Sequence, residues 1–320
     1  MGGVTSESGF IATLRALATE PAARGLLDDA AVLSFGDARL VLTHDMLIEG
    51  VHFLASDPPG DVAWKLIAVN ISDLAAKGAR PLGILLGYSL GRDEAWNTAF
   101  IAGLRDAAAE FSVALLGGDT VAMPPGAPLA LGLTALGEAM SDRVPSRAGA
   151  RAGDILWVTG TIGDSGAGLR IARGEMEGPD ALLDHYRRPR PRPAAGQALA
   201  PHVNAMMDVS DGLLVDARRM ADASGVAAEI DLDCVPLSRD YAALCGEGQA
   251  GRLAAAVAGD DYELLFAAAP RQNDTLFTIS RSLGTTFTPV GRLAAGEGIT
   301  VIDCEGPVPL PSRLGYEHMS

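Results

Sequence analysis

DVAWKLIAVNISDLAAKGARP, residues 61 to 81, is the stretch of sequence that decides the fold. It is apolar nearly all round as far as Lys77, and the GARP that follows supplies a glycine and a proline, so we expect a buried helix. Asp73 lies inside this helix, where a lone carboxylate is costly unless it is paired or bound to a cation. Asn70 lies one turn earlier and is expected to share the same polar pocket. An aspartate held only by hydrogen bonds is the alternative.

Short apolar segments with turn signals between them flank this helix. Gly36 and Asp37 separate two of the segments, which predicts a β-hairpin. Near the N-terminus, Phe10, Leu14 and Leu17 recur at spacings of four and three, which predicts a short helix packed on the body by that face. The other expected elements are strands at 31–35, 39–42, 81–90 and 127–139 and a helix at 93–111.

The turn-rich segment SDRVPSRAGARAGD, residues 141–154, is the best candidate for a domain boundary. We therefore divide the chain into an N-terminal domain, residues 1–146, and a C-terminal domain, residues 147–320. Helices and strands mix without a regular βαβ alternation, so the expected fold class is α+β. In the second domain strands are expected at 154–160, 204–210, 227–232 and 262–269, and helices at 164–174 and 211–225.

The composition limits the classes of protein to which the chain can belong. It has 320 residues, 48% of them hydrophobic, which is enough for packed cores. No apolar stretch approaches the roughly 20 residues of a membrane helix, and MGGVTSESGF lacks a secretory signal, so we expect a cytoplasmic protein. The net charge of -15 argues against nucleic-acid binding, and the basic run RRPRPRP at 187–193 is better interpreted as an extended connector. Three widely spaced cysteines suggest neither a disulfide framework nor a zinc site.

Aspartates recur where apolar segments end. For any single one the simpler interpretation is a helix cap or a turn, and Ser210 with Asp211 would suit a helix start. Together, however, short side chains with hard oxygen atoms suit Mg²⁺, which completes its shell with water and phosphate oxygens. The pattern therefore predicts strands that deliver carboxylates to divalent cations. The segments are LLDDAAVL (26–33), VLTHDM (41–46), LLGGDT (115–120) and MMDVSDGL (206–213).

The chain lacks the common phosphate-binding sequences. It contains no GxxxxGK[ST], which excludes a P-loop. VTGTIGDSGAG, residues 158–168, follows an expected strand, but its glycine spacing is not that of the dinucleotide fingerprint. A nucleotide would therefore be held through metal ions and scattered basic groups such as Arg147.

A series of motifs, in order along the chain, resembles the thiamine-monophosphate kinases, a family of the aminoimidazole ribonucleotide synthetase-like superfamily. With GYEH at 315–318 the resemblance covers essentially the whole chain, and ordered motifs over that length are more specific than any one of them. The motifs are LLDDAAVL, LTHDMLIEGVHF, KLIAVNISDLAAKGARP, LLGGDT, SRAGARAGD, VTGTIGDSGAGL, DVSDGLLVD and GDDYELLF.

The resemblance implies transfer of the γ-phosphoryl group of ATP to thiamine monophosphate, giving thiamine diphosphate and ADP, with several Mg²⁺ ions. It also implies an N-terminal α+β domain that forms a homodimer and binds ATP near the subunit interface, and a C-terminal α+β domain. Carried over position by position, the metal ligands are Asp29, Thr43, His44, Asp45, Asp73, Asp119, Asp208 and Asp211. The ATP contacts are Gly118, Asp119, Arg147 and Ser210, and the substrate contacts are His52, Asp260 and Tyr316.

The implied reaction needs no strong catalytic base, because the attacking phosphate oxygen is already anionic at neutral pH. The main obstacle is repulsion between two polyanions, which Mg²⁺ relieves by bridging phosphate oxygens. We therefore expect direct transfer without a covalent intermediate. Tyr316 is expected to stack on the cationic thiazolium, an interaction worth about 0.5 to 2 kcal/mol. His52, without the resemblance, is explained as well by an ordinary hydrogen-bonded polar residue.

Two positions depart from the family pattern. The family usually has Ser or Thr where this chain has His44, so a ligand at this position is expected to be the backbone carbonyl. It usually has GEDYEL where this chain has GDDYEL, so the carboxylate of Asp260 reaches less far toward the substrate.

Two other classes of function stay open. Selenophosphate synthetases, aminoimidazole ribonucleotide synthetases and hydrogenase-maturation dehydratases share the superfamily. The first normally have a catalytic Cys or selenocysteine near the start and the last a C-terminal Cys, and this chain has neither. The second alternative is a catalytically idle nucleotide-binding protein, against which the nearly full set of aspartates argues.

Overall fold

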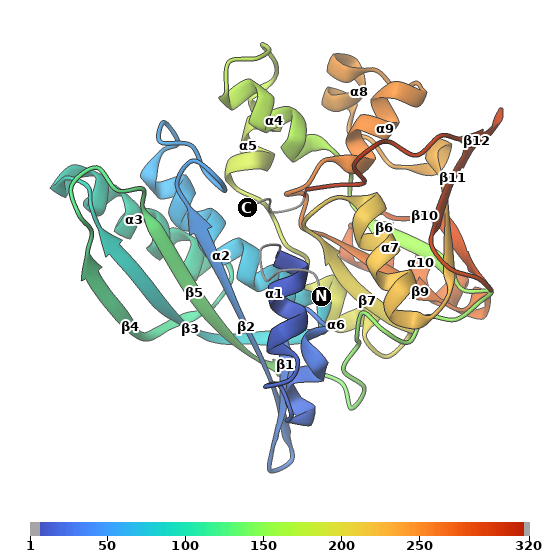
Figure 1. Ribbon diagram of the computed structural model, residues 1–320, viewed down its shortest axis with the longest axis horizontal. Coiled ribbons are helices and arrows are strands. Elements are labelled where there is room, and N and C mark those ends of the chain that lie inside the picture. The colour runs from blue at the N-terminus through green and yellow to red at the C-terminus, as the bar shows by residue number, and fades with distance from the viewer. Residues whose placement is uncertain (1–6, 317–320) are drawn as a thin grey trace.

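Two mixed β-sheets with helices packed against them make up the computed structural model of the chain (Figure 1). The structure describes residues 7–316; residues 1–6, and Glu317 and His318 of the GYEH motif, lie outside this range. The first sheet has five strands and the second has seven. The arrangement confirms the predicted mixture of helices and strands.

The N-terminal sheet has the strand order β1-β2-β5-β3-β4. β1 and β2 form the predicted hairpin around Gly36 and Asp37, with Ala31 opposite Leu42. The neighbours in this sheet run antiparallel except β3 and β4, which are parallel. The strands are β1 Ala31–Phe35, β2 Ala38–Ile48, β3 Ala79–Leu90, β4 Ala114–Ala122 and β5 Ala130–Ala139.

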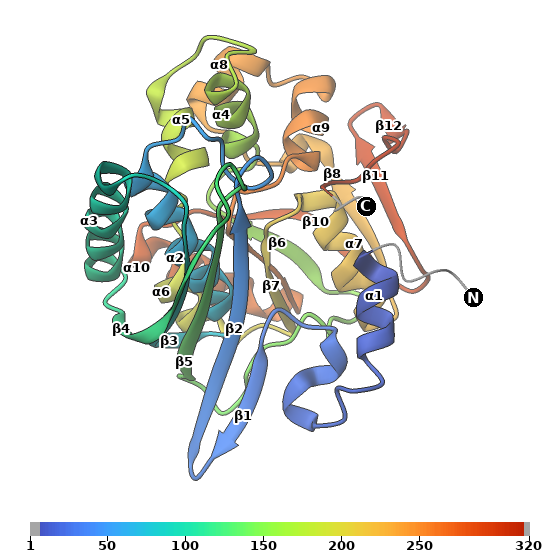
Figure 2. The same cartoon turned by 60° about the vertical axis from the view of Figure 1, so that its left-hand side comes forward.

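Helices α2, Pro59–Ala76, and α3, Glu94–Glu110, cover one face of this sheet (Figure 2). Successive side chains of β2 point to opposite faces, so Thr43 is buried toward α2 while His44 is exposed on the other face, which we call the outer face. The two helices lie very close together, because a Cβ atom on Gly103 would come within 2.3 Å of the carbonyl oxygen of Gly60. The sheet therefore has one covered face and one open face.

The C-terminal sheet has the strand order β12-β11-β8-β10-β6-β9-β7, with β8 and β11 parallel. Its strands are β6 Ile155–Thr159, β7 Ala205–Val209, β8 Ala227–Asp231, β9 Glu263–Ala268, β10 Phe287–Ala294, β11 Ile299–Asp303 and β12 Gly306–Val308. The helices of this half are α4 Asp164–Ala172, α5 Asp180–Arg187, α6 Pro193–Leu199, α7 Leu213–Ser224, α8 Arg239–Cys245, α9 Gln249–Val257 and α10 Asn273–Leu283. The C-terminal half also contains the short 3₁₀ helices η2 Leu232–Cys234 and η3 Pro270–Gln272, and the N-terminal half contains η1 Pro21–Leu26.

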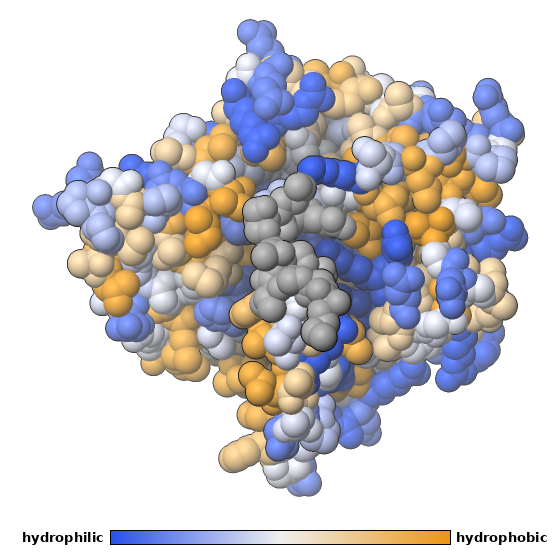
Figure 3. Space-filling view, viewed as in Figure 1, coloured by the Kyte–Doolittle hydropathy of each residue, from blue (hydrophilic) through white to orange (hydrophobic). Residues whose placement is uncertain are grey.

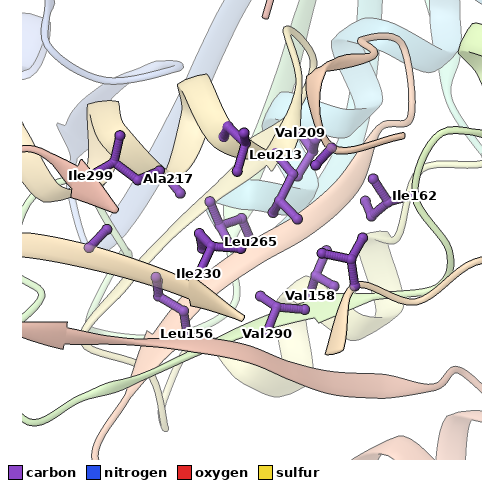
Figure 4. Packing of buried hydrophobic residues seen from close by; sticks show 14 of the residues in the cluster. Leu156, Val158, Ile162, Val209, Leu213, Ala217, Ile230, Leu265, Val290 and Ile299 are labelled. Atoms are coloured by element: carbon purple, nitrogen blue, oxygen red, sulfur yellow. The ribbon is translucent and has the colours of Figure 1, made fainter. Parts of the chain in front are cut away.

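Each half has its own hydrophobic core, and α2 connects them. Figure 4 shows the C-terminal core, in which Val158, Leu213 and Leu265 come from β6, α7 and β9. A separate cluster packs Ala75, near the end of α2, with buried residues of the C-terminal half. A Cβ atom on Gly196 of α6 would lie 1.9 Å from the carbonyl oxygen of Ala75, so the two helices touch backbone to backbone. α2 is thus packed on both halves.

Three local predictions were wrong. The first helix, α1 Glu7–Leu14, ends before Leu17, the last residue of the predicted apolar face. Leu17 is 78% exposed. Asp45 does not end a strand, since β2 continues past it to Ile48. Neither Ser210 nor Asp211 caps α7 with its side chain.

The remaining whole-chain expectations concern cysteines, the connector and membranes. Cys234, Cys245 and Cys304 are free thiols, as the spacing predicted. Residues 189–192 of the basic run form neither helix nor strand, in agreement with an extended connector. Within residues 7–316 no helix is both long and apolar enough to cross a membrane.

Candidate active site

A cavity of about 540 Å³ lies where the two halves meet. β2 contributes Asp45 to its wall, α2 contributes Asp73, and the C-terminal end of β7 with the residues after it contributes Asp208 and Ser210. The wall is completed by Leu169 of α4 and by residues of the segments before β9 and near the C-terminus. Because α2 is packed against both sheets, it holds the carboxylates of the two halves on one cavity.

The structure brings eight of the predicted site residues to this cavity. They come from segments far apart in the sequence, so the fold has assembled them. They are Asp45, His52, Asp73, Asp208, Ser210, Asp211, Asp260 and Tyr316.

The buried carboxylates of Asp73 and Asp208 are unfavourable as charged groups in the protein alone. Burial raises the pKa of Asp73 well above its usual value, and neighbouring carboxylates, first of all that of Asp45, raise it further. Burial and the charge of Asp29 raise the pKa of Asp208 in the same direction. The hydroxyls of Thr43 and Ser72 donate to Asp73 and Asp208, and each bond lowers the pKa of its acceptor, but not enough to cancel the rise.

Asp45, whose side chain is half-buried, shows the same behaviour. Burial raises its pKa to about 6, and the charges of Asp29 and Asp211 contribute to the rise. Its backbone N–H donates to Asn70 Oδ1 at 3.1 Å, so Asn70 does share the polar pocket, as predicted. The alternative interpretation of Asp73, as a lone carboxylate held only by hydrogen bonds, does not apply. Asp73 is one of several neighbouring carboxylates that repel each other.

Asp29 is in the opposite electrostatic situation. Its carboxylate lies 2.8 Å from Lys77 Nζ and 2.5 Å from Arg147 Nη2. Burial alone would raise the pKa of Asp29, but the two cations outweigh it and hold the pKa below its usual value. The adjacent Asp28 accepts from Lys77 and lies 2.5 Å from Arg24 Nη1. Asp29 is thus charged and already compensated, whereas Asp73 and Asp208 are not.

Asp216 organises the loop before α7, a role that we did not predict. One carboxylate oxygen of Asp216 accepts from the backbone N–H groups of Ser210, Asp211 and Gly212 at 3.1 to 3.2 Å. Arg219 lies 2.9 Å from the other oxygen and also pairs with Asp211. This corrects the capping interpretation, because the carboxylate that satisfies the free N–H groups comes from inside the helix. An acidic residue in the first turn of α7 was the signal that could have revealed it.

The residues predicted to contact the substrate also line this cavity. His52 Nδ1 accepts from the backbone N–H of Ile48 at 3.0 Å, which leaves its Nε2 as the protonated nitrogen. Asp260 Oδ2 lies 2.8 Å from Lys65 Nζ, and its Oδ1 accepts from the Tyr262 hydroxyl at 3.0 Å. The side chain of Tyr316 is half-exposed, and its backbone N–H donates to the carbonyl oxygen of Asp211 at 2.9 Å.

Three predicted residues lie away from the cavity. His44 points to the outer face of the N-terminal sheet, where its Nδ1 lies 2.9 Å from the hydroxyl of Thr134. Gly118 lies on β4, where a Cβ atom would come within 1.9 Å of the carbonyl oxygen of Leu86. Asp119 is paired with Gly87, which is paired with Gly132, which is paired with Met46, so Asp119 and Met46 lie on the same outer face. Three strand spacings separate them, which is about 14 Å.

The three other predicted residues lie behind the cavity wall. The hydroxyl of Thr43 donates to Asp73, and the carbonyl oxygen of Asp29 lies 3.3 Å from the same hydroxyl. Arg147 binds Asp28 through its backbone N–H and Asp29 through its guanidinium.

No three His, Cys, Asp or Glu side chains within residues 7–316 are placed to hold a metal ion among themselves. The predicted metal ligands therefore do not form one preassembled cluster.

Comparison with known proteins covers both halves of the chain. Residues 27–139 match the family model for AIR synthase related protein, N-terminal domain, and residues 151–304 match the model for its C-terminal domain. The thiamine-monophosphate kinase of Caulobacter vibrioides is 41% identical over 306 residues, which is 93% of this chain and 86% of that protein.

Two solved structures are similar over nearly the whole fold. One, described as AaThiL complexed with AMPPCP and TMP, has a TM-score of 0.86 at 32% identity and covers 98% of this chain and 97% of its own. The other, a thiamine-monophosphate kinase from Stenotrophomonas maltophilia, has a TM-score of 0.76 at 37% identity. The match covers 90% of this chain and 93% of that protein. The predicted two-domain aminoimidazole ribonucleotide synthetase-like fold is thereby confirmed.

Proposed function

The chain belongs to the thiamine-monophosphate kinase family, and we propose that the cavity between its two halves is where ATP and thiamine monophosphate react. The protein is a kinase that transfers the γ-phosphoryl group of ATP to thiamine monophosphate and produces thiamine diphosphate. The same cavity is lined by Asp73 and Asp208 and by His52 and Asp260. Two anionic groups can therefore meet there only if positive charge accompanies them.

The observation that carries this proposal is the uncompensated charge of Asp45, Asp73 and Asp208. Burial and mutual repulsion dominate their pKa values, so the ionised cluster is stable only with cations beside it. Their short side chains offer the hard oxygen atoms that Mg²⁺ prefers. Because Mg²⁺ keeps several waters and takes further oxygens from phosphates, one or two carboxylates per ion suffice, which fits the absence of a preassembled cluster in residues 7–316.

In the proposed arrangement Asp45, Asp73, Asp208 and Asp211 would hold Mg²⁺, which when bound would supply positive charge to the phosphate oxygens. Ser210 is fixed beside them because Asp216 binds its backbone N–H, and we assign it to the ATP phosphates. Asp29 is already paired with Lys77 and Arg147, so its charge is compensated before any metal ion binds. The attacking oxygen of thiamine monophosphate is anionic at neutral pH, so the chain's residues need only align the two phosphates.

A second copy of the chain is the proposed occupant of the outer face. Large apolar side chains lie exposed there, including Met46 at 49% and Leu85 at 47%, and Leu116 on the edge strand β4 is 60% exposed. Figure 3 shows apolar residues interspersed with polar ones on the left half of the molecule, where Figure 1 places this sheet. A homodimer across this face would bury them and would bring Asp119 next to the partner rather than to its own cavity. We also propose a cytoplasmic location, where ATP is available.

The test of the proposed function is an assay of phosphoryl transfer. The protein is incubated with ATP and Mg²⁺ and either thiamine or thiamine monophosphate, and products are separated by chromatography, with EDTA as the control. We expect thiamine diphosphate and ADP only from thiamine monophosphate with Mg²⁺ present. Phosphorylation of free thiamine alone would refute the proposal. Binding of a non-hydrolysable ATP analogue without any turnover would instead favour the idle nucleotide-binding protein.

A further inference from the structure

Lysine is almost missing from this chain, and its two lysines lie on one helix. Of the 25 basic residues only Lys65 and Lys77 are lysines, and the rest are arginines. Lys65 lies in the middle of α2 with 2% of its surface exposed, and Lys77 is the C-cap of the same helix with none exposed. Burying an ammonium group is costly unless it is paired, so each of these positions calls for a specific reason.

Lys65 contacts three different segments of the chain. Its Nζ lies 2.8 Å from Asp260 Oδ2 and donates to the carbonyl oxygen of His52 at 3.2 Å. The same atom lies 4.3 Å from the ring centroid of Tyr186, a residue of α5. One ammonium group thus binds the segment after β2, the segment before β9 and a helix of the C-terminal half. A compact ammonium with three donor hydrogens suits a position that has several partners.

The carboxylate held by Lys65 belongs to a strained turn. Asp260 and Tyr262 both have positive φ angles, 67° and 51°, which non-glycine residues rarely adopt. The backbone N–H groups of the two residues donate to the carbonyl oxygens of Ser210 and Val209, at 2.7 and 2.8 Å. The Asp260 side chain is 31% exposed toward the cavity, so its orientation matters to whatever binds there.

We propose that Lys65 is a positioning residue for thiamine monophosphate: it fixes the carboxylate of Asp260 and the backbone at His52 so that both face the substrate. The proposal rests on the proposed function of the cavity. It also explains how the chain tolerates aspartate at position 260, because the shorter carboxylate is held by Lys65 and Tyr262 in one defined orientation. Lys65 acts through these residues and needs no contact with the reacting phosphates.

The alternative is that Lys65 only stabilises the contact between the two halves. Its replacement would then lower the stability of the protein without changing the KM for one substrate more than for the other. A matched control is available in Arg188, which pairs with Asp61, one turn before Lys65 on α2, at 2.5 Å. Arg188→Gln removes another ion pair between α2 and the C-terminal half, but at a site that does not line the cavity.

The experiment compares steady-state kinetics of the wild type, Lys65→Met, Asp260→Asn, the double variant and Arg188→Gln. For Lys65→Met we expect the KM for thiamine monophosphate to rise about tenfold or more while the KM for ATP stays within about twofold. Asp260→Asn should show the same selective rise, and the double variant should be no worse than the poorer single variant, because both substitutions remove one interaction. Arg188→Gln should leave both KM values unchanged.

The outcomes separate this inference from the proposed function. If the wild type makes no thiamine diphosphate from thiamine monophosphate, the proposed function itself fails. If the wild type is active but Lys65→Met raises both KM values equally or neither, the positioning role is wrong. Multiplicative effects in the double variant would also overturn it. Should Lys65→Met not fold, Asp260→Asn alone decides, since it keeps a side chain of the same shape: an unchanged KM for thiamine monophosphate would contradict the proposal.

Discussion

Replacing Asp45 by asparagine should make the metal-free protein more stable and at the same time inactive. Burial and the charges of Asp29 and Asp211 raise the pKa of Asp45 from 3.8 to about 6. A difference of roughly two units corresponds to about 3 kcal/mol between the charged and neutral forms. Asparagine has nearly the same shape without the charge, so it avoids this cost.

The sign and the pH range follow from the raised pKa. In the folded protein Asp45 binds its proton more tightly than in the unfolded chain, so the stability that its neutral form provides is present below about pH 4 and lost as the pH rises through about 6. Relative to the wild type, Asp45→Asn should therefore gain about 3 kcal/mol at pH 8, about half of that at pH 5 and nothing below pH 4. The gain should disappear in Mg²⁺, because the wild type then binds the ion and the variant does so poorly.

The assay is urea unfolding followed by circular dichroism at pH 8 and pH 5, in EDTA and in Mg²⁺. Asp106→Asn is the control, because Asp106 lies exposed on α3 and its replacement should change nothing under any of the four conditions. The reasoning would be refuted if Asp45→Asn were no more stable than the wild type in EDTA at pH 8. It would also be refuted if the gain were the same at both pH values.

Three further predictions test the site, the outer face and the helix packing. Asp73→Asn and Asp208→Asn should each lower turnover by at least about a hundredfold with an unchanged circular dichroism spectrum, and near wild-type kinetics would remove them from the metal site. Leu85→Glu puts a charge on the outer face, so light scattering should show a homodimer for the wild type and a monomer for the variant; equal masses would contradict the proposed interface. Gly103→Ala should lower the free energy of unfolding by about 1 to 3 kcal/mol in a urea titration, because its Cβ would meet Gly60 backbone atoms at 2.3 Å. Gly60→Ala, whose Cβ would have only ordinary contacts, should be tolerated, and equal effects of the two changes would contradict this account.

The sequence by itself determined the elements that depend on neighbouring residues. The unbroken apolar composition around Asn70 predicted the buried helix α2, and Gly36 with Asp37 predicted the hairpin, because periodicity and turn chemistry act over a few residues. The order of the acidic motifs also predicted the family. Within this family pattern the sequence indicated that Asp45, Asp73 and Asp208 carry chemistry, and the structure places all three on one cavity.

Tertiary structure alone decided which charges meet. Lys65 and Asp260 are 195 positions apart, and Arg147 lies 118 positions from Asp29, so no local pattern could pair them. The faces of the N-terminal sheet were likewise set by strand pairing, which turned His44 and Asp119 away from the cavity that their motifs suggested. The physical reason is range: side-chain spacing and turn chemistry act over a few residues, whereas the Coulomb energy of a buried group depends on whatever the completed fold places within a few ångströms of it.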